Sequence, residues 1–335
     1  FFKQKTAYEI LVIGAGINGA GAAQQLAAGG YKVLLIEKGD FAGGATNKSS
    51  RILHCGLRHL TPGRSIWEFI FNPVKLFIAC QNARNAMIAR SEISSSMSQL
   101  VRPFRFYFPI FRGDPYLSWQ LDYAFKLLYL LGPRDNSLEY YRYSGKYLNQ
   151  VPFKKWFRDS NKLLSISSFK DYQFISAERL TVDTILDSEK LGATVRNYTL
   201  VHELKMLDEG WEAILRDVIT REEVNVKTKL ILNLSGPWGN RVNQTLKSRI
   251  PDKVVGLKGS HIVTKLPEEF SECGIMFINR AKEPMYILPW HKMHYIGLNR
   301  TPYGGKLDDV TATIDEIEWL IGEVNYILPR LNLKR

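Results

Sequence analysis

The chain has 335 residues, of which 45% are hydrophobic, so it can build one large core or two smaller ones and lacks the composition of a disordered chain. Lysine and arginine (45) outnumber aspartate and glutamate (33), and the formal charge of +12 favours anionic partners: a phosphorylated substrate, a nucleotide or an acidic membrane surface. The basic residues are spread along the chain, which disfavours a nucleic-acid-binding arm, and no apolar run reaches the roughly 18 residues of a membrane-crossing helix.

A β-α-β unit opens the predicted fold. Residues 10–13 form a short apolar run that stops at a glycine, residues 19–28 are rich in small helix-compatible residues, and residues 32–37 form a second apolar run. A helix between two buried strands predicts a parallel pair and an α/β domain. Residues 3–9 resemble the translation of a sequencing-library adapter, so we expect residues 1–9 to be a non-native tail and leave them out of the fold.

The rest of the chain mixes helices with strands. We predict helices at residues 65–89 (broken at Pro73), 122–131, 177–190 and 313–327. We predict strands at residues 101–111, 194–201, 203–207, 211–216, 224–226, 229–234, 259–263, 285–289 and 295–298. The strand predicted at 229–234 is apolar and buried like the first two strands, although it lies far from them in the sequence. We therefore expect two domains that interleave along the chain.

The cysteine and histidine positions do not indicate a metal site. Cys55, Cys80 and Cys273 lie far apart without a C-x-x-C pair, which argues against a zinc site or a disulfide framework and fits a reducing compartment. His291 and His294 are separated by two residues, and we interpret them as polar surface rather than metal ligands.

A glycine-rich turn joins the first strand to the first helix. Gly14, Gly16 and Gly19 form G-x-G-x-x-G: the first permits a tight turn, the second lets the backbone approach a pyrophosphate, and the third lets helix and strand pack closely. Phosphates at such a turn meet the free N–H groups of a helix N-terminus. Glu37 ends the second strand, where its carboxylate can accept hydrogen bonds from a ribose and would repel a 2′-phosphate. These features predict a dinucleotide site.

Four further blocks resemble the FAD-dependent, membrane-type glycerol-3-phosphate dehydrogenases. Residues 44–60 are similar to that family's G/A-T-S-x-x-S-S-[KR]-L-I-H-G-G-L-R-Y-L stretch, and residues 233–238 to its N-A-[TS]-G-x-W element. Residues 258–263 match K-G-[SV]-H-I-V, and residues 287–297 resemble the I-P-W…I-G strands. The blocks stand in family order over about residues 10–330, and the first and third are the most specific.

The resemblance implies an α/β fold in which a Rossmann-like FAD-binding domain, of the glutathione-reductase and D-amino-acid-oxidase type, interleaves with a mixed-sheet α+β substrate domain. We expect the FAD-binding domain at residues 10–70 and 165–250 and the substrate domain at 71–164 and 251–330. The implied reaction is oxidation of sn-glycerol 3-phosphate to dihydroxyacetone phosphate by hydride transfer to FAD, with electrons passed on to quinone.

The predicted FAD contacts come from the glycine turn, the hydroxyl- and amide-rich segment after the second strand, and the matched blocks. They are Gly14, Gly16, Ile17, Asn18, Gly19, Glu37, Lys38, Thr46, Asn47, Ser49, Ser50, His54, Gly56, Val201, Ser235, Gly236 and Trp238.

The substrate site is predicted around two basic positions. Arg58 can bind a phosphate bidentately, and His261 is expected to accept the hydroxyl proton of the substrate. His54 is an alternative base or a support for the flavin. The resemblance also places His59 and Asn299 at the substrate.

The chain departs from the family at several positions. Cys55 stands where the family has glycine, His59 replaces a tyrosine, Asn299 replaces a threonine and Arg300 replaces an acidic residue, which increases anion attraction or changes the substrate. The family's downstream G-V-R-P arginine and last flavin-binding glycine segment have no counterpart, so we expect a C-terminally truncated chain that binds FAD poorly and turns over little.

The resemblance leaves several partners open. Residues 102–112 and 119–131 mix basic with aromatic or aliphatic side chains, which suits either a lipid interface near a quinone or a packed strand and helix of the substrate domain. A homodimer and a cytoplasmic location, peripheral on the inner face of the membrane, are compatible with it. Rival functions are an oxidase that uses O₂, an enzyme that oxidises an amino acid or a 2-hydroxy acid on the same fold, and a non-catalytic flavin-binding or membrane-associated module.

Overall fold

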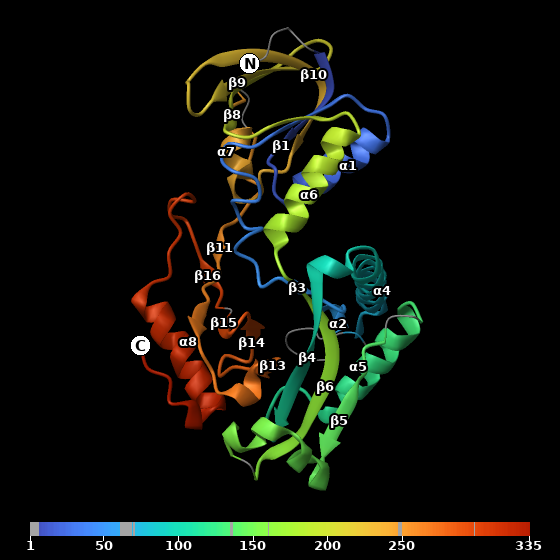
Figure 1. Cartoon of the computed structure of the whole chain (residues 1–335), viewed down its shortest axis with the longest axis vertical. Helices are drawn as coiled ribbons and strands as arrows, with labels where there is room; N and C mark the ends of the chain where they lie inside the picture. Colours follow the sequence, from blue (N-terminus) through green and yellow to red (C-terminus); the bar gives the residue numbers. More distant parts are fainter. Residues whose placement is uncertain are drawn as a thin grey trace. The chain divides into compact units, whose positions relative to one another are not determined.

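The computed structural model describes residues 7–60, 69, 71–134, 137–159, 161–246, 250–297 and 299–335. The chain forms two compact units, each assembled from separate segments (Figure 1). The first unit contains the described residues of Phe1–Arg51, Ile175–Gly256 and Tyr303–Asp308, and the second contains those of Ile52–Phe174, Leu257–Pro302 and Asp309–Arg335. The predicted segment 10–70 is therefore divided after Arg51, and the assignment of each unit to cofactor or substrate stays a prediction.

The first unit is built on a six-stranded sheet in the order β7-β2-β1-β10-β9-β8. Its strands are β1 (Ala7–Ile13), β2 (Val33–Ile36), β7 (Thr194–Arg196), β8 (Thr199–Met206), β9 (Trp211–Asp217) and β10 (Glu223–Asn233). β1 pairs in parallel with β2, as the β-α-β pattern predicts, and on its other side it pairs in parallel with β10. It begins at Ala7, so Tyr8 and Glu9, which the sequence analysis left outside the fold, are part of the strand.

Apolar side chains cover both faces of this sheet. On one face, α1 (Ile17–Ala28) places Ala20, Ala23 and Ala27 against the strands, and α6 (Ala177–Lys190) adds Ile185. On the other face, Leu204, Ala213 and Leu215 of the β8–β9 meander pack on Leu11 and Ile13 of β1. Buried on both faces, residues 10–13 of β1 and the whole of β2 form continuous apolar runs.

The second unit holds an eight-stranded mixed sheet. Seven strands follow the order β12-β15-β14-β13-β4-β6-β3, and β5 pairs with β6 off this path. They are β3 (Ile52–Leu53), β4 (Val101–Phe111), β5 (Tyr141–Ser144), β6 (Leu163–Phe174), β12 (Ile262–Thr264), β13 (Cys273–Ile278), β14 (Pro284–Trp290) and β15 (Met293–Gly297). β11 (Leu257–Lys258) and β16 (Thr301–Pro302) form a separate small sheet.

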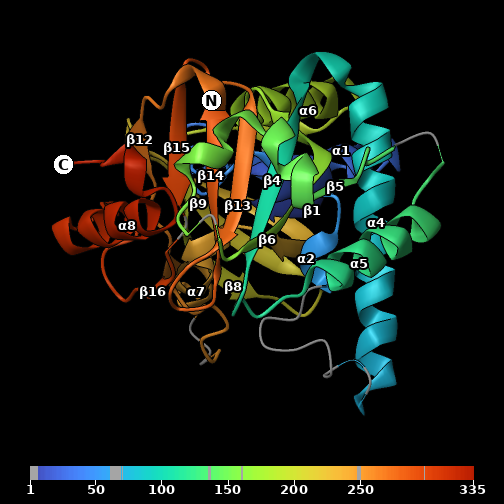
Figure 2. The same ribbon diagram turned by 90° about the horizontal axis from the view of Figure 1, so that it is seen from below.

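Helices cover this second sheet on both faces, as Figure 2 shows. α4 (Pro73–Ser96) and α5 (Ser118–Leu131) pack on one face over the phenylalanines of β4, and α2 (Leu57–Leu60) joins the same core. α8 (Ile314–Ile327) packs on the other face through Leu320 and Val324. α7 (Gly239–Asn243) belongs to the first unit.

Several predicted elements need correction. Residues 224–226 and 229–234 belong to one strand, β10, and α4 runs to Ser96 rather than ending at residue 89. Residues 65–68 and 70 of that predicted helix lie outside the described residues. β4 is an interior strand whose Phe106, Phe108 and Ile110 are buried, so the lipid-interface interpretation of 102–112 is wrong.

Within the part of the chain that the structure describes, no helix combines the length and apolar character needed to cross a membrane.

Candidate functional site

The glycine turn has the geometry that its spacing predicts. Gly14 adopts φ +101°, and a Cβ there would lie 2.7 Å from the carbonyl oxygen of Leu234. At Gly19 a Cβ would lie 1.7 Å from the carbonyl oxygen of Gly14, so only glycine lets α1 pack this closely on β1. At Gly16, which caps α1, it would lie 3.1 Å from Oγ1 of Thr46. Ile17 and Asn18 follow at the exposed first turn of α1.

Glu37 is fixed by the backbone of the same turn. One carboxylate oxygen accepts a hydrogen bond from Ala15 N at 2.9 Å and the other accepts from Gly39 N at 3.1 Å. Each carboxylate oxygen has capacity for a second donor, so a ribose hydroxyl can still be bound. The structure therefore holds Glu37 beside the turn in an orientation compatible with the predicted contact.

The hydroxyl- and amide-rich segment lies beside the start of α1. The Thr46 hydroxyl accepts a hydrogen bond from Ile17 N at 3.1 Å, and the Ser49 hydroxyl accepts one from Arg51 N at 3.2 Å. The side-chain oxygen of Asn47 is buried and has no hydrogen-bond partner among the described residues. Such an orphaned acceptor is uncommon in a folded protein and fits a site that a ligand completes. Ser50 is partly buried in this segment.

Lys38 and Trp238 meet at an acidic residue that sequence analysis did not select. Asp308 forms ion pairs with Lys38 and with Arg241, the latter at 2.9 Å, and accepts a hydrogen bond from Nε1 of Trp238 at 3.0 Å. The ammonium of Lys38 also lies 4.0 Å from the centre of the Trp238 ring. Hydrogen bonding from Lys38 lowers the pKa of Asp308. In this structure Lys38 is therefore a member of an ion-pair cluster.

The remaining contacts predicted in the first unit lie after β10 and on β8. Ser235 donates a hydrogen bond from its hydroxyl to Oδ1 of Asn233 at 2.6 Å, and Gly236 adopts φ +58°. These residues follow the carboxyl end of β10, beside the end of β1, where parallel sheets commonly bind ligands. Val201 is partly buried against the core and precedes an irregularity in the β8–β9 register.

In the second unit, residues 54–59 form a turn that a buried ion pair supports. Gly56 adopts φ +90°, and a Cβ there would lie 2.9 Å from the carbonyl oxygen of Ala83 on α4. Cys55 donates its backbone N–H to Asp171 of β6 at 3.4 Å, and Asp171 is paired with Arg90 of α4 at 3.3 Å. Burial, together with the positive charge of Arg58 and then of His59, lowers the pKa of His54 to about 4, so His54 is neutral at pH 7.

Register places His261, Gly297 and Tyr286 in one row across three strands. Ile262 pairs with Ile296, so His261, which directly precedes β12, lies opposite Gly297; Gly297 pairs on its other side with Tyr286. A Cβ on Gly297 would lie 2.3 Å from the His261 ring, so the glycine makes room for the imidazole. Burial lowers the pKa of His261.

Tyr286 is a candidate site residue that sequence analysis did not select. Its ring lies 6.5 Å from that of His54, which links this row to the turn at residues 54–59. Burial raises the pKa of Tyr286, and the charges of Arg58 and Arg300 oppose the rise. Only the pairing register could have identified it, because a tyrosine in an apolar strand carries no signal of its own.

Two arginines stand near this row with their side chains available. Arg58 and Arg300 are exposed, and neither has an ion-pair or hydrogen-bond partner among the residues that the structure describes. His59, beside Arg58, is partly exposed, and burial together with Arg58 lowers its pKa. The unit thus offers two free guanidinium groups beside neutral imidazoles, an arrangement suited to a small phosphorylated or carboxylated substrate.

Asn299 and His294 have structural partners. The Asn299 side-chain oxygen accepts a hydrogen bond from Ser260 N at 2.6 Å, and its amide donates to Thr301 at 3.3 Å, so Asn299 holds the backbone next to His261. Its predicted substrate contact stays a prediction. His294 is buried and lies 2.9 Å from the carbonyl oxygen of Phe270, so its interpretation as polar surface is wrong. The described residues contain no group of three or more side chains suited to hold a metal ion.

A family model described as FAD dependent oxidoreductase (DAO) matches residues 9–335, which is nearly the whole chain. The chain belongs to this family. The membership confirms the predicted cofactor, FAD, and the predicted class of FAD-dependent oxidoreductase. Gly14, Gly16 and Gly19, where a side chain would fill the turn, and the orphaned oxygen of Asn47 fit the phosphate end of such a cofactor.

Individual relatives of this DAO-family chain carry related names. It is 32% identical over 350 residues to a glycerol-3-phosphate dehydrogenase of Synechocystis sp., covering 99% of this chain and 59% of the relative. It is 27% identical over 341 residues to an alpha-glycerophosphate oxidase of Streptococcus pyogenes, covering 98% and 52%. The chain therefore spans little more than half the length of these curated relatives.

A solved structure confirms the predicted α/β fold class. The glycerol-3-phosphate dehydrogenase of Bacillus halodurans, complexed with FAD, matches with a TM-score of 0.74 at 19% identity, over 98% of this chain and 55% of that one.

Proposed function

We propose that this protein oxidises sn-glycerol 3-phosphate to dihydroxyacetone phosphate, with FAD as the immediate electron acceptor and a quinone as the final one. The observation that carries the proposal is the row of His261, Gly297 and Tyr286 with two free arginines, Arg58 and Arg300, in the same unit. The names of the relatives, which refer to glycerol 3-phosphate, support the same substrate.

The phosphate of the substrate would bind the two arginines. A phosphate monoester carries close to two negative charges at pH 7, and guanidinium groups bind its oxygens in a bidentate way. Two unpaired cations match a dianion better than the single negative charge of a 2-hydroxy acid or the zwitterion of an amino acid. The charge of this site therefore favours the phosphorylated substrate over the other substrates considered.

Oxidation of a secondary alcohol releases a proton from the hydroxyl and a hydride from the carbon. When bound, FAD supplies the acceptor for the hydride from C2. A ring nitrogen of His261 would take the hydroxyl proton, because burial keeps this imidazole neutral at pH 7 and so able to accept it. As the proton and the hydride leave, the C2–O bond becomes the carbonyl of dihydroxyacetone phosphate.

Tyr286 and His54 would orient the substrate rather than exchange protons with it. Burial raises the pKa of Tyr286, so the phenol keeps its proton and can donate a hydrogen bond to the substrate oxygen. His54, with its pKa near 4, stays neutral at working pH and adds no charge beside the arginines.

At the cofactor end, the first unit would bind FAD through the glycine turn, Glu37 and the segment from Thr46 to Ser50. Ile17 N, at the start of α1, donates to Thr46 of this segment, and the other N–H groups of the first turn of α1 would bind the pyrophosphate. His54, Gly56, Val201, Ser235, Gly236 and Trp238 remain predicted contacts of the cofactor.

Transfer of electrons to a quinone would bring the protein to the membrane surface. α5 exposes Trp119, Tyr123, Tyr129 and Leu130, whose exposed fractions are 49%, 62%, 65% and 79%. The ammonium of Lys126 lies 5.3 Å from the Tyr123 ring on the same helix. Aromatic, aliphatic and basic side chains on one exposed helix favour a peripheral position on an acidic membrane face.

A second candidate is an oxidase that passes electrons to O₂, because one relative is named alpha-glycerophosphate oxidase. Two steady-state assays separate a quinone-linked dehydrogenase from an oxidase. One uses a redox dye as electron acceptor under argon, and the other uses O₂ as acceptor without the dye. The proposal predicts dye reduction with sn-glycerol 3-phosphate, none with glycerol, lactate or glycine, and little peroxide. Turnover of lactate or glycine in preference to the phosphate ester would overturn it.

A further inference from the structure

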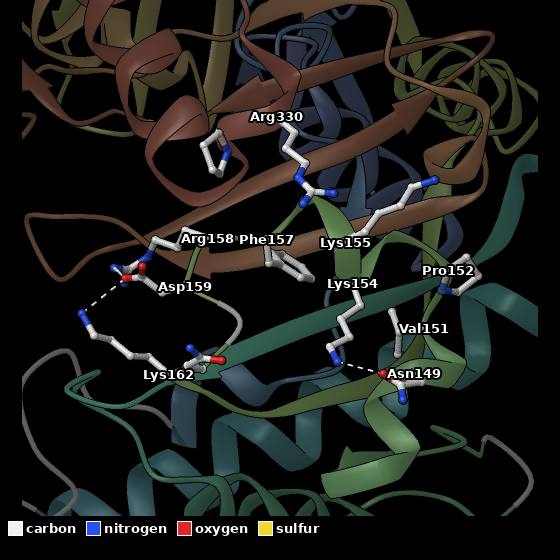
Figure 3. A pocket seen from close by; sticks show the side chains of 12 residues that line it. Asn149, Val151, Pro152, Lys154, Lys155, Phe157, Arg158, Asp159, Lys162 and Arg330 are labelled. Carbon is white, nitrogen blue, oxygen red and sulfur yellow. Dashed lines mark hydrogen bonds and ion pairs between the residues drawn. The ribbon is translucent and has the colours of Figure 1, made fainter.

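A second concave site lies in the second unit, in a cavity of about 750 Å³. Its walls are the 3₁₀ turn η3 (Pro152–Trp156), the loop that follows it, and the turn η6 (Pro329–Leu331) (Figure 3). None of the residues proposed above for substrate or cofactor lines it. Its charged lining residues are Lys154, Lys155, Arg158, Lys162, Arg330 and Asp159.

The basic residues of this pocket exceed the acids that could neutralise them. Asp159 is shared by Arg158 at 3.6 Å and Lys162 at 3.5 Å, and Lys155 pairs with Glu269 at 2.8 Å. These two acids balance two of the five cations, which leaves three positive charges in excess.

The two remaining basic residues of the pocket have no acidic partner in the part of the chain that the structure describes. Lys154 donates to the neutral amide oxygen of Asn149 at 2.8 Å, as Figure 3 shows. Arg330 has neither an ion pair nor a hydrogen bond among the described residues. A concave surface with unbalanced positive charge concentrates anions.

Arg158, another of the five basic residues of the pocket, is held in place at the pocket wall. The Arg158 guanidinium lies 4.1 Å from the centre of the Tyr326 ring and 4.7 Å from that of Phe111, and its backbone N–H donates to Ile327 O at 2.9 Å. Its Nε atom is buried and has no hydrogen-bond partner among the described residues. A guanidinium packed between two rings in this way loses less conformational entropy than a mobile side chain when its exposed nitrogens bind an acceptor.

We propose that this pocket is an anion-binding site for a small ligand with two or more phosphate groups. Three excess positive charges match such a ligand better than a single carboxylate, and the volume lies in the range of small-molecule sites. The ligand is a phosphorylated metabolite free in solution; a phosphorylated lipid headgroup shares the chemistry and is the alternative source. Arg330 and Lys154 would bind the phosphates, and Arg158 would complete the site.

Calorimetric titration of the FAD-saturated protein with inorganic triphosphate tests this proposal, with inorganic phosphate as the weaker comparison. We expect triphosphate to bind at least about tenfold more tightly than phosphate, with a dissociation constant that rises steeply with salt. Arg330→Gln and Lys154→Gln should each weaken triphosphate binding about tenfold or more. Lys190→Gln, which removes the same charge from the end of α6 in the first unit, should leave the affinity unchanged.

Two further variants separate this pocket from the other anion sites of the chain. Gly16→Val, which blocks the glycine turn and is titrated without FAD, and Arg58→Ala, which weakens the proposed substrate site, should both keep triphosphate binding. If triphosphate does not bind, or if Arg330→Gln binds it as tightly as the parent protein, the proposal is overturned. Vesicles with phosphorylated headgroups distinguish the two sources of the ligand. If the parent protein binds these vesicles but not free triphosphate, and Arg330→Gln loses the vesicle binding, the free metabolite is contradicted as the ligand.

Discussion

Gly16 caps α1 and Gly21 lies within it, and the two glycines have different surroundings. A Cβ on Gly16 would lie 3.1 Å from Thr46, whereas one on Gly21 would have no atom within 4 Å. Gly16→Val should therefore abolish FAD retention, and Gly21→Ala should keep it, because alanine only removes conformational freedom from the unfolded chain. The ratio of flavin to protein absorbance after gel filtration measures both variants, and a fully yellow Gly16→Val protein would refute the assignment of the turn.

His261 should control the acid side of the pH profile. Because burial lowers its pKa below the usual 6.5, the neutral base is lost only as the pH falls below that value, so kcat/KM should be level above about 6.5 and fall below it. His261→Asn should lower kcat/KM by about 10²- to 10⁴-fold and remove this limb.

A matched control exists for the His261 variant. His291 is exposed and has φ +53°, a conformation that asparagine tolerates, so His291→Asn should leave the profile unchanged. An acid limb that persists near pH 4 in His261→Asn would transfer the base to His54, whose pKa is about 4.

Arg58 and Arg300 should act mainly on substrate affinity. A hydrogen-bonded charge contributes roughly 1.5–3 kcal/mol, so Arg58→Ala and Arg300→Ala should each raise KM for sn-glycerol 3-phosphate by about 10- to 100-fold. Arg221→Ala, in a turn of the first unit, serves as the charge-matched control. An unchanged KM in Arg58→Ala would remove this residue from the site.

At the scale of elements, the pair of Arg90 on α4 and Asp171 on β6 ties a helix, a strand and the turn at residues 54–59 together. Both side chains are buried, and Asp171 also accepts from Cys55 N. Burial raises the pKa of Asp171, and Arg90 opposes the rise. Arg90→Met leaves a buried carboxylate without its partner, which should cost about 3–5 kcal/mol of unfolding free energy.

A double-mutant cycle tests this coupling. Adding Asp171→Asn to Arg90→Met should recover much of the loss in urea denaturation, since the amide can still accept from Cys55 without carrying a charge. Additive losses in the double variant would show that the pair does not act as a unit.

Sequence patterns predicted the elements that have strong local signals. The turn at Gly14–Gly19, the helix Ala177–Lys190 and the strand Val101–Phe111 are confirmed because periodicity, caps and glycine spacing act within a few residues. β6 was missed because its buried positions include Ser165, Ser167 and Ser168, which resemble a loop until their partners across the sheet are known.

The residues of the candidate site also differ in whether a local sequence pattern could identify them. The glycines and Arg58 could be predicted from motifs. Tyr286 and Asp308 could not, because their partners lie far away in the sequence and only strand pairing or packing brings them together.

For the whole molecule, the exposed face of α5 predicts binding to acidic vesicles. Tyr129→Ser with Leu130→Ser removes two exposed apolar side chains and should weaken co-sedimentation by about tenfold or more. Met206→Ser with Ile219→Ser, at similarly exposed positions of the first unit, is the matched control. Equal vesicle binding by both double variants would refute this role of α5.

The absorbance of the flavin reports on the cofactor and on the proposed substrate in a single experiment. FAD-loaded protein should be mixed with sn-glycerol 3-phosphate without oxygen. Our account predicts rapid bleaching of the oxidised flavin band, which His261→Asn slows and which glycerol does not cause. A yellow protein that stays yellow with sn-glycerol 3-phosphate, yet bleaches with an amino acid or a 2-hydroxy acid, would keep the fold and contradict the proposed substrate.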